Sequence, residues 1–350
     1  MSVNVYGTAV LIGVLNSLDN APVTFFRDRF YTMEVRSDKE EILFDVIDKK
    51  RRLAPFVSPL VRGKLMEKRG FNTRIFKPAY VKPKSVIKPE DSIKRTAGEQ
   101  LQGSLSMAQR RDIHIRTALQ EQDEAITMRE EVMCAEGLRL GQVTVAGEGY
   151  PTVVLSFGRD AALREVLSGA NLFDVLTIDE IFEYLEDKAT LVRQKSGGSI
   201  VRDVVCGTSA WRTIVGKIRG NAAFAAILVG SANRGQTTEV QLGPRTAEKV
   251  VFQGTVGQFN FWTYSDSYQD EDGADVEIFP ANEILLVGAD VEGHRCYGAI
   301  HDPRAGLQPL PRFPKDWIDE DPPAEYVMTQ SAPLMVPLRP NASFSAVVLA

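Results

Sequence analysis

The clearest repeating pattern of apolar positions lies between residues 106 and 136. Positions three and four apart form one stripe with only two polar members: Ile115, Ala118, Leu119, Gln122, Ala125, Ile126, Arg129, Val132 and Met133. This spacing is typical of a helix with one apolar face. Ser104 or Ser106 can cap its start, and Gly137 suits a left-handed stop. The pattern predicts a helix of roughly 45 Å that packs on one side only, as a helix lying along a sheet does.

Shorter apolar runs follow this helix and predict strands. Residues 143–145 and 152–155 flank Gly147-Glu148-Gly149, a pattern typical of a hairpin. Thr177 and Glu180 form a capping box, so we expect a helix from there to about Gln194. Because strands and helices do not alternate regularly, we expect an α+β fold. The other predicted elements are a short helix capped by Thr208 or Ser209 and strands at 199–206, 250–252, 259–264, 283–287, 325–329 and 344–349, the last tied into a sheet.

The N-terminal part of the chain, up to about residue 50, carries no strong periodic signal. Its aromatic residues Phe25, Phe26, Phe30 and Tyr31 are flanked by charged positions. We therefore expect an extended arm that rests on other structure, not an independent domain.

Residues 49–95 form a strongly basic segment, with fifteen Lys and Arg against three acids, a local charge of +12. Five prolines exclude central strands, because proline cannot donate to a strand ladder. Residues 73–77 and 79–82 are nevertheless strand-like, and Gly70 offers a turn nearby. The segment predicts a long two-stranded hairpin that projects from the body. Because such a hairpin is only marginally stable alone, we expect it to lie on an acidic surface.

Charge is divided unevenly along the chain. The net charge is −5, so the chain outside the basic segment carries −17, and residues 250–294 contain nine acids and no Lys or Arg. A chain divided in this way can bind copies of itself head to tail. Binding of nucleic acid by the basic segment is the alternative. The residues that we expect at the contact between subunits are Arg62, Lys64, Lys68, Arg69, Arg74, Lys77, Lys82, Lys84 and Lys88.

The sequence carries no motif for catalysis or cofactor binding. Gly216-Lys217 lacks the flanking residues of a phosphate loop. Cys134, Cys206 and Cys296 fit neither a metal site nor a disulfide framework, so we expect buried free thiols. No run approaches the roughly 20 apolar residues of a membrane span, and the start lacks a basic signal-peptide region. We therefore expect a protein made in the cytoplasm, without catalytic residues, metal, cofactor or membrane partner.

Two blocks of the sequence resemble the major capsid proteins of lambda-like bacteriophages. The first block runs through Val57-Ser58-Pro59-Leu60-Val61-Arg62-Gly63 and Phe76-Lys77-Pro78-Ala79-Tyr80-Val81-Lys82-Pro83-Lys84. The second runs from Phe313-Pro314-Lys315-Asp316-Trp317 through Asp321-Pro322-Pro323 to residues 326–335. Both blocks are long and stand in the order expected for the family, and the weaker match between them keeps that order.

This resemblance implies the Hong Kong 97-type phage capsid fold. On the family pattern, residues 1–52 are an N-terminal arm, 53–100 an extended loop and 178–305 an axial domain. Residues 101–177 form a peripheral domain with a spine helix, to which 306–350 return. The resemblance implies a structural protein, not an enzyme. Such proteins assemble into hexamers and pentamers that close an icosahedral head around packaged double-stranded DNA.

The resemblance also implies partners. These are a decoration protein at the local threefold positions, a portal and DNA held non-specifically, in a virion assembled in the host cytoplasm. Because no long, charged, helical extension precedes the basic segment, we expect a separate scaffold protein. We also expect a non-covalent shell, although loop lysines and Asn341 supply groups that some relatives join. Two alternatives stay open: a nanocompartment shell of the same fold, and a nucleic-acid-binding protein that uses residues 49–95.

Overall fold

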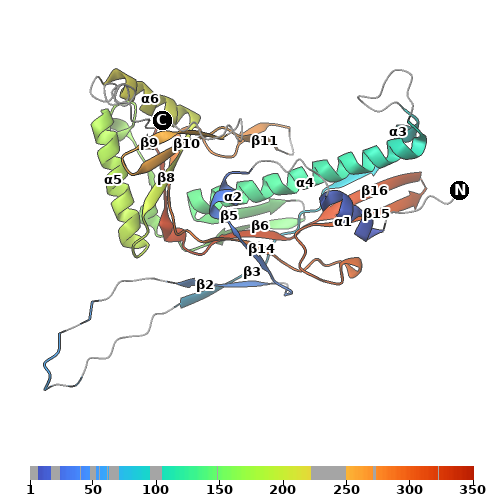
Figure 1. Cartoon of the computed structure of the whole chain (residues 1–350), viewed down its shortest axis with the longest axis horizontal. Helices are drawn as coiled ribbons and strands as arrows, with labels where there is room; N and C mark the ends of the chain where they lie inside the picture. Colours follow the sequence, from blue (N-terminus) through green and yellow to red (C-terminus); the bar gives the residue numbers. More distant parts are fainter. Residues whose placement is uncertain are drawn as a thin grey trace, which may run out of the picture.

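A computed structural model describes most of the chain: residues 7–16, 24–39, 41–47, 53–54, 56–60, 62, 71–94, 105–147, 149–221, 250–270, 273–321 and 323–350. Figure 1 shows one long helix, α4, running through the body of the molecule. Helices α5 and α6 lie at one end, and β15 and β16 lie at the other. The hairpin of β2 and β3 extends away from the body. The fold therefore mixes helix and sheet without regular alternation, as the sequence predicts.

Helix α4 spans Met107–Leu140, 34 residues or about 51 Å. Its start is confirmed, because Ser106 caps it and forms a capping box with Gln109. Its predicted stop is wrong: the left-handed residue is Gly141, with φ 67°. Gly137 instead lies inside the helix, where an added Cβ would come within 2.8 Å of Tyr31 Oη. That glycine therefore serves close packing and not chain reversal.

Burial changes along α4. In its first half, one face is buried and includes Ile115, Leu119 and Gln122, whereas Ala125 is exposed. From Glu130 to Leu138 nearly every residue is buried. The prediction of packing on one side is therefore right for the first half of α4 and wrong for the second, which other elements surround.

A three-stranded sheet covers the first half of α4. Its order is β15 (Phe313–Glu320), β16 (Pro323–Gln330) and β4 (Lys84–Ile87), so the proline-flanked β4 is an edge strand as expected. Ile87 and Val327 of this sheet pack with Leu119 of α4 and with Leu11 of helix α1 (Thr8–Asn16). Gln122 binds the sheet through a bond from its Nε2 to the Val327 carbonyl oxygen, 2.9 Å long. Helix α3 (Pro89–Ile93) follows β4.

A six-stranded sheet forms the other end of the molecule. Its order is β7 (Arg164–Val166), β18 (Ser343–Val347), β13 (Glu283–Gly288), β8 (Val201–Gly207), β10 (Phe259–Tyr264) and β9 (Val250–Val256). Helices α5 (Ile178–Lys195) and α6 (Thr208–Gly220) pack on one face of it. The last strand is paired inside this sheet, as predicted, and Thr177 caps α5 as predicted.

The predicted cap of α6 is wrong. Gly207 occupies the cap position and offers no side chain. The amide groups of Ser209 and Ala210 instead donate to the Ala281 carbonyl oxygen, at 3.0 and 2.9 Å. An added Cβ on Gly207 would lie within 2.6 Å of backbone atoms of Pro280 and Ala281. The contact with Ala281 therefore replaces a side-chain cap at the start of α6.

A core of buried apolar side chains lies between the six-stranded sheet and the second half of α4. It includes helix α2 (Phe26–Phe30) and a sheet of β1 (Met33–Arg36), β14 (Gly293–Tyr297) and β17 (Pro333–Pro337). Phe26 and Tyr31 are fully buried here. An extended arm is thus the wrong description for residues 8–16 and 26–30, which are helical. Two small hairpins complete the fold: β5 (Gln142–Gly147) with β6 (Tyr150–Ser156), as predicted, and β11 (Ser267–Gln269) with β12 (Asp275–Glu277).

The projecting hairpin differs from the one expected. Its strands are β2 (Ile42–Ile47) and β3 (Phe71–Phe76), so one strand precedes the basic segment. Residues 79–82 do not form a strand. Val81 makes a single isolated bridge to Ser331, because Pro78 and Pro83 cannot donate to a ladder. The chain after β3 is therefore part of the body.

Candidate assembly interface

The structure divides the nine predicted contact residues between two places. Lys64, Lys68 and Arg69 lie outside the described residues. Arg74 lies on β3, and Arg62 is exposed in the connection between β2 and β3. The remaining four, which continue along the body after β3, have exposed side chains: Lys77, Lys82, Lys84 and Lys88.

Two of the body lysines cover aromatic rings. The Nζ atom of Lys82 lies 4.8 Å from the centre of the Tyr80 ring, and that of Lys84 lies 4.8 Å from the centre of the Tyr326 ring. Within the described part of the chain, no carboxylate forms an ion pair with either amine. Both charges are therefore free to meet a carboxylate from outside the subunit.

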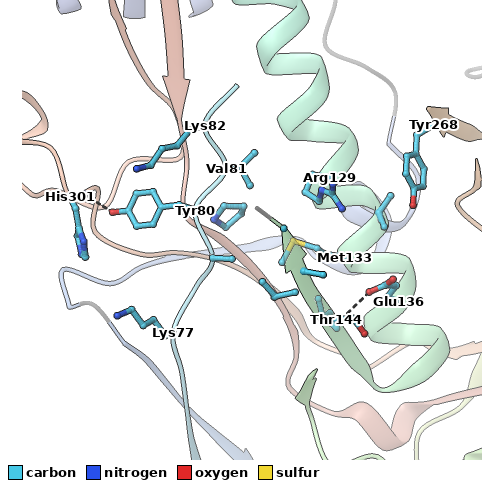
Figure 2. Close-up of a pocket in the computed structure, with 17 residues that line it drawn as sticks. Lys77, Tyr80, Val81, Lys82, Arg129, Met133, Glu136, Thr144, Tyr268 and His301 are labelled. Atoms are coloured by element: carbon cyan, nitrogen blue, oxygen red, sulfur yellow. Dashed lines mark hydrogen bonds between the residues drawn. The ribbon is translucent and has the colours of Figure 1, made fainter. Parts of the chain in front are cut away.

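A groove lies where the hairpin joins the body, and we call it the basic groove. It encloses about 840 Å³. Figure 2 shows the segment after β3 on one side of it, α4 on the other and β5 between them. The rim carries basic side chains and one carboxylate, Glu136, which accepts a bond from the Thr144 amide at 3.3 Å. The basic residues that line the groove are Lys77, Lys82, Arg129 and His301.

Tyr80 fixes the wall of the basic groove. Its hydroxyl donates to the Ala299 carbonyl oxygen and accepts from the His301 amide, both at 2.5 Å. Pro78 packs so closely on Gly298 that an added Cβ there would lie 2.6 Å from the proline ring. The base of the hairpin is therefore held firmly on the body. This feature was not predicted, because its two halves are more than 200 residues apart in the sequence.

Two adjacent buried carboxylates on α4 fix the segment around α2. Glu131 accepts the backbone N–H groups of Phe25, Phe26 and Arg27 at 2.8 to 2.9 Å, and the Tyr264 hydroxyl at 3.2 Å. Burial raises the pKa of Glu131, and the three backbone donors offset part of that rise. Sequence reasoning missed this site. The available signal was an acid pair beside the apolar stripe of α4.

The neighbouring carboxylate, Glu130, is paired with arginines. It lies 3.1 Å from Arg27 Nε and 2.6 Å from Arg312 Nη1. Arg312 also reaches Asp123 at 2.6 Å. These coulombic contacts and hydrogen bonds raise the pKa of Arg312, although burial alone would lower it. Residues 24–31 are thus joined to α4 by charge as well as by apolar packing.

Two groups of exposed acids concern us here. One is the outer face of α5, with Asp179, Glu180, Glu183, Glu186 and Asp187. The other is the turn between β15 and β16, with Asp319, Glu320 and Asp321, which we call the acidic tip. In the acid-rich stretch at 250–294, Asp266 and Glu283 are buried, whereas Asp270, Asp275 and Glu277 at the β11–β12 hairpin are exposed.

The described residues hold no cluster of three or more His, Cys, Asp or Glu side chains placed to bind a metal ion. The three cysteines are free and buried, as predicted, and burial raises the pKa of each thiol. Within the same described ranges, no helix is long and apolar enough to cross a membrane.

Comparison with known proteins identifies the family to which this chain belongs. Residues 7–348 match the family described as phage major capsid protein E. The P21 prophage-derived major head protein of Escherichia coli O6:H1 is 30% identical over 89% of this chain and 90% of its own length. The major capsid protein of Escherichia phage lambda is 27% identical over 99% of this chain and 100% of its own.

Solved structures agree on the fold. A prophage capsid protein from Escherichia coli superposes with a TM-score of 0.73 at 22% identity, covering 99% of this chain and 100% of that one. The capsid of Ralstonia phage GP4 gives a TM-score of 0.55 at 15% identity, covering 95% of this chain and 93% of that one. The chain therefore belongs to the phage major capsid protein E family and has the role of a major capsid protein, which assembles with copies of itself into the shell of a virion.

Proposed function

We propose that the chain assembles into hexamers and pentamers of an icosahedral head that encloses the double-stranded DNA of a tailed phage. The observation that carries this proposal is the projecting β2–β3 hairpin. Its two strands pair only with each other among the described strands, and it points away from the body (Figure 1). Because a two-stranded hairpin is marginal in water, a neighbouring subunit is the natural support for it.

The domains of the Hong Kong 97-type fold follow from the same proposal. The hairpin and the chain around it act as the extended loop, and α4 acts as the spine helix. The six-stranded sheet with α5 and α6 acts as the axial domain. The residues before β2 act as the N-terminal arm, although the buried Phe26 and Tyr31 anchor part of that arm within its own subunit.

Charge would guide the assembly. Each exposed ion pair contributes only about 0–1 kcal/mol, so one loop contributes little. Many repeated contacts, together with buried apolar area, would stabilise a closed shell. The negative charge of the chain outside the basic segment also suits a shell that encloses DNA. A basic inner surface would bind DNA through counterion release and slow its movement.

Four partners complete the proposal: a decoration protein at the local threefold positions, a portal, a separate scaffold protein and non-specifically held DNA. Assembly would take place in the host cytoplasm. The likeness to lambda-like capsid proteins supports these partners, and the exposed sheet and hairpin surfaces leave room for them.

Negative-stain electron microscopy of the purified protein, made with its scaffold, tests this function. Icosahedral shells with nuclease-protected DNA from infected cells would support it. Shells filled with a cargo protein would favour a nanocompartment, and a subunit that only binds DNA in a salt-sensitive way would favour a nucleic-acid-binding role. The absence of any shell would overturn the proposal.

A further inference from the structure

Within the proposed shell, on which this inference rests, we propose that the acidic tip of one subunit docks into the basic groove of a neighbouring copy. The groove is lined by Lys77, Lys82, Arg129 and His301 together with Tyr80, Met133 and Val143. Such a surface fits a short turn that carries carboxylates. The occupant is therefore a second copy of this chain.

Two charges of the groove, on Arg129 and Lys82, are available for such a partner. Arg129 and Lys82 have exposed side chains, and neither forms an ion pair within the described residues. Among the described residues, the one carboxylate that lines the groove, Glu136, already accepts the Thr144 amide. Within that part of the chain, the groove therefore carries more positive than negative side chains.

The charges of the acidic tip are equally available. Asp319, Glu320 and Asp321 are consecutive and exposed, and none of their side chains forms a hydrogen bond or ion pair with a described residue. They stand at the end of two long paired strands, where Glu320 is paired with Pro323. Three like charges so close together repel one another, and a basic site would relieve that repulsion.

Strand geometry places the two surfaces on different subunits. Pro333 lines the groove and follows directly after β16, whose other end carries the tip. The seven steps from Gln330 back to Pro323 span about 23 Å at the usual rise of a strand. Figure 1 likewise shows β15 and β16 at one end of the molecule and β5 nearer its middle. The tip therefore cannot fold back into its own groove.

Shape favours the acidic tip over the acidic face of α5. The acidic face of α5 belongs to an 18-residue helix, and a helix with its side chains is about 10–12 Å wide. In a two-stranded turn the two backbones lie about 4.8 Å apart, and the acids of the tip stand together at its end. A volume near 840 Å³ suits several side chains of such a turn.

The contact has a consequence for assembly. Tip and groove are different surfaces, so their contact is heterologous and repeats from one subunit to the next. It would also be salt-dependent, because its charges are exposed before docking. The acidic tip would thus set the spacing between neighbours, in addition to the contacts of the projecting hairpin.

Cross-linking tests the contact directly. The double variant Glu320→Cys with Arg129→Cys is assembled and treated with a short bismaleimide reagent; the three native cysteines are buried and do not interfere. We expect covalent dimers and higher oligomers on denaturing gels from the double variant and only monomer from either single variant. Shells of the double variant that yield only monomer would overturn the inference while leaving the proposed function intact.

A charge swap covers the case in which the cysteine variant assembles poorly. Replacing Asp319, Glu320 and Asp321 with Lys should lower the fraction of protein in shells by about tenfold or more. Adding Lys82→Glu and Arg129→Glu should restore most of it. The matched control, Glu183, Glu186 and Asp187 of α5 replaced with Lys, should lower that fraction less than the tip variant does. Normal assembly of the tip variant, or no rescue by the swap, would contradict the docking; failure of the unaltered protein to form shells would count against the proposed function instead.

Discussion

Single residues decide how closely α4 is packed. Gly137 and Gly216 both lie inside helices, where alanine normally adds about 1 kcal/mol of stability over glycine. Their surroundings differ. An added Cβ on Gly137 would come within 2.8 Å of Tyr31 Oη, whereas nothing lies within 4 Å of one on Gly216. Tyr31 is fully buried, and its hydroxyl donates to the Cys134 carbonyl oxygen at 3.3 Å, so displacing it would disturb the core.

We predict opposite effects for the two alanine substitutions. Gly216→Ala should raise the free energy of unfolding by about 0.5–1 kcal/mol. Gly137→Ala should lower it by about 1–3 kcal/mol, because the new methyl group overpacks the core. Urea denaturation of the unassembled subunit, followed by circular dichroism, measures both. A stabilising Gly137→Ala would show that Tyr31 does not hold this position.

Glu131 is the second residue whose effect can be predicted. Glu131→Ala leaves the N–H groups of Phe25, Phe26 and Arg27, at the start of α2, without their acceptor and should lower the free energy of unfolding by about 2–5 kcal/mol at pH 7. Glu121→Ala, at an exposed position of the same helix, is the control and should change little.

The cost of losing Glu131 should depend on pH. The pKa of Glu131 in the folded protein is raised above 4.5, so the folded state binds this proton more readily than the unfolded state. The stability that this proton contributes is present below the pKa of Glu131 in the unfolded state. It is lost as the pH rises through the pKa of Glu131 in the folded state. The difference between the native protein and Glu131→Ala should therefore grow as the pH falls from 7 towards 5. A difference that shrinks over this range would contradict the assignment.

At the scale of elements, the hairpin of β2 and β3 projects from its own subunit (Figure 1). Its base is fixed through Tyr80 and Pro78, but its strands form a separate two-stranded sheet. The hairpin should therefore affect assembly much more than it affects the stability of the subunit.

We predict that reversing Lys64, Lys68 and Arg69 to Glu leaves a soluble, folded subunit that does not form shells. The reason is the local charge of +12, which this variant halves. Circular dichroism should report an unchanged fold, and sedimentation should report the loss of shells. Arg116, Arg193 and Arg212, all exposed on helices, give a control with the same change in net charge. Normal shells from the hairpin variant would refute the prediction.

At the scale of the whole molecule, opposite charges are displayed on separate surfaces. The basic hairpin and groove lie away from the acidic face of α5 and from the acidic tip, so non-covalent contacts between copies are available in more than one direction. Asn341 is engaged within its own chain, because its Oδ1 accepts the Asp160 amide at 2.8 Å. That bond disfavours a role for Asn341 in an isopeptide link to a neighbour.

We therefore predict a non-covalent shell. Boiled mature particles should run on denaturing gels mainly as a monomer near 38.7 kDa. The variant Asn341→Asp should give the same gel pattern as the native protein. A ladder of oligomers that resists boiling and reductant, and that Asn341→Asp abolishes, would show a covalent bond instead.

The amino-acid sequence by itself determined the local features of this protein. The apolar stripe of α4, the capping boxes of Ser106 and Thr177, and the hairpin of β5 and β6 follow from short-range spacing, and the structure contains each. The basic segment could also be recognised from the sequence, and two of its residues, Lys77 and Lys82, line the basic groove. These features depend on residues close in sequence, so periodicity and capping rules reach them.

Only the tertiary structure decided which distant segments meet. It paired β3 with β2 in place of residues 79–82, and it joined the Tyr80 hydroxyl to Ala299. It also used Gly137 for packing against Tyr31 and placed Glu131 as the cap of a helix about 105 residues away. Each outcome depends on burial and on donors and acceptors far apart in the chain. No local pattern encodes such a contact, because its free energy arises only when the folded core removes both groups from water.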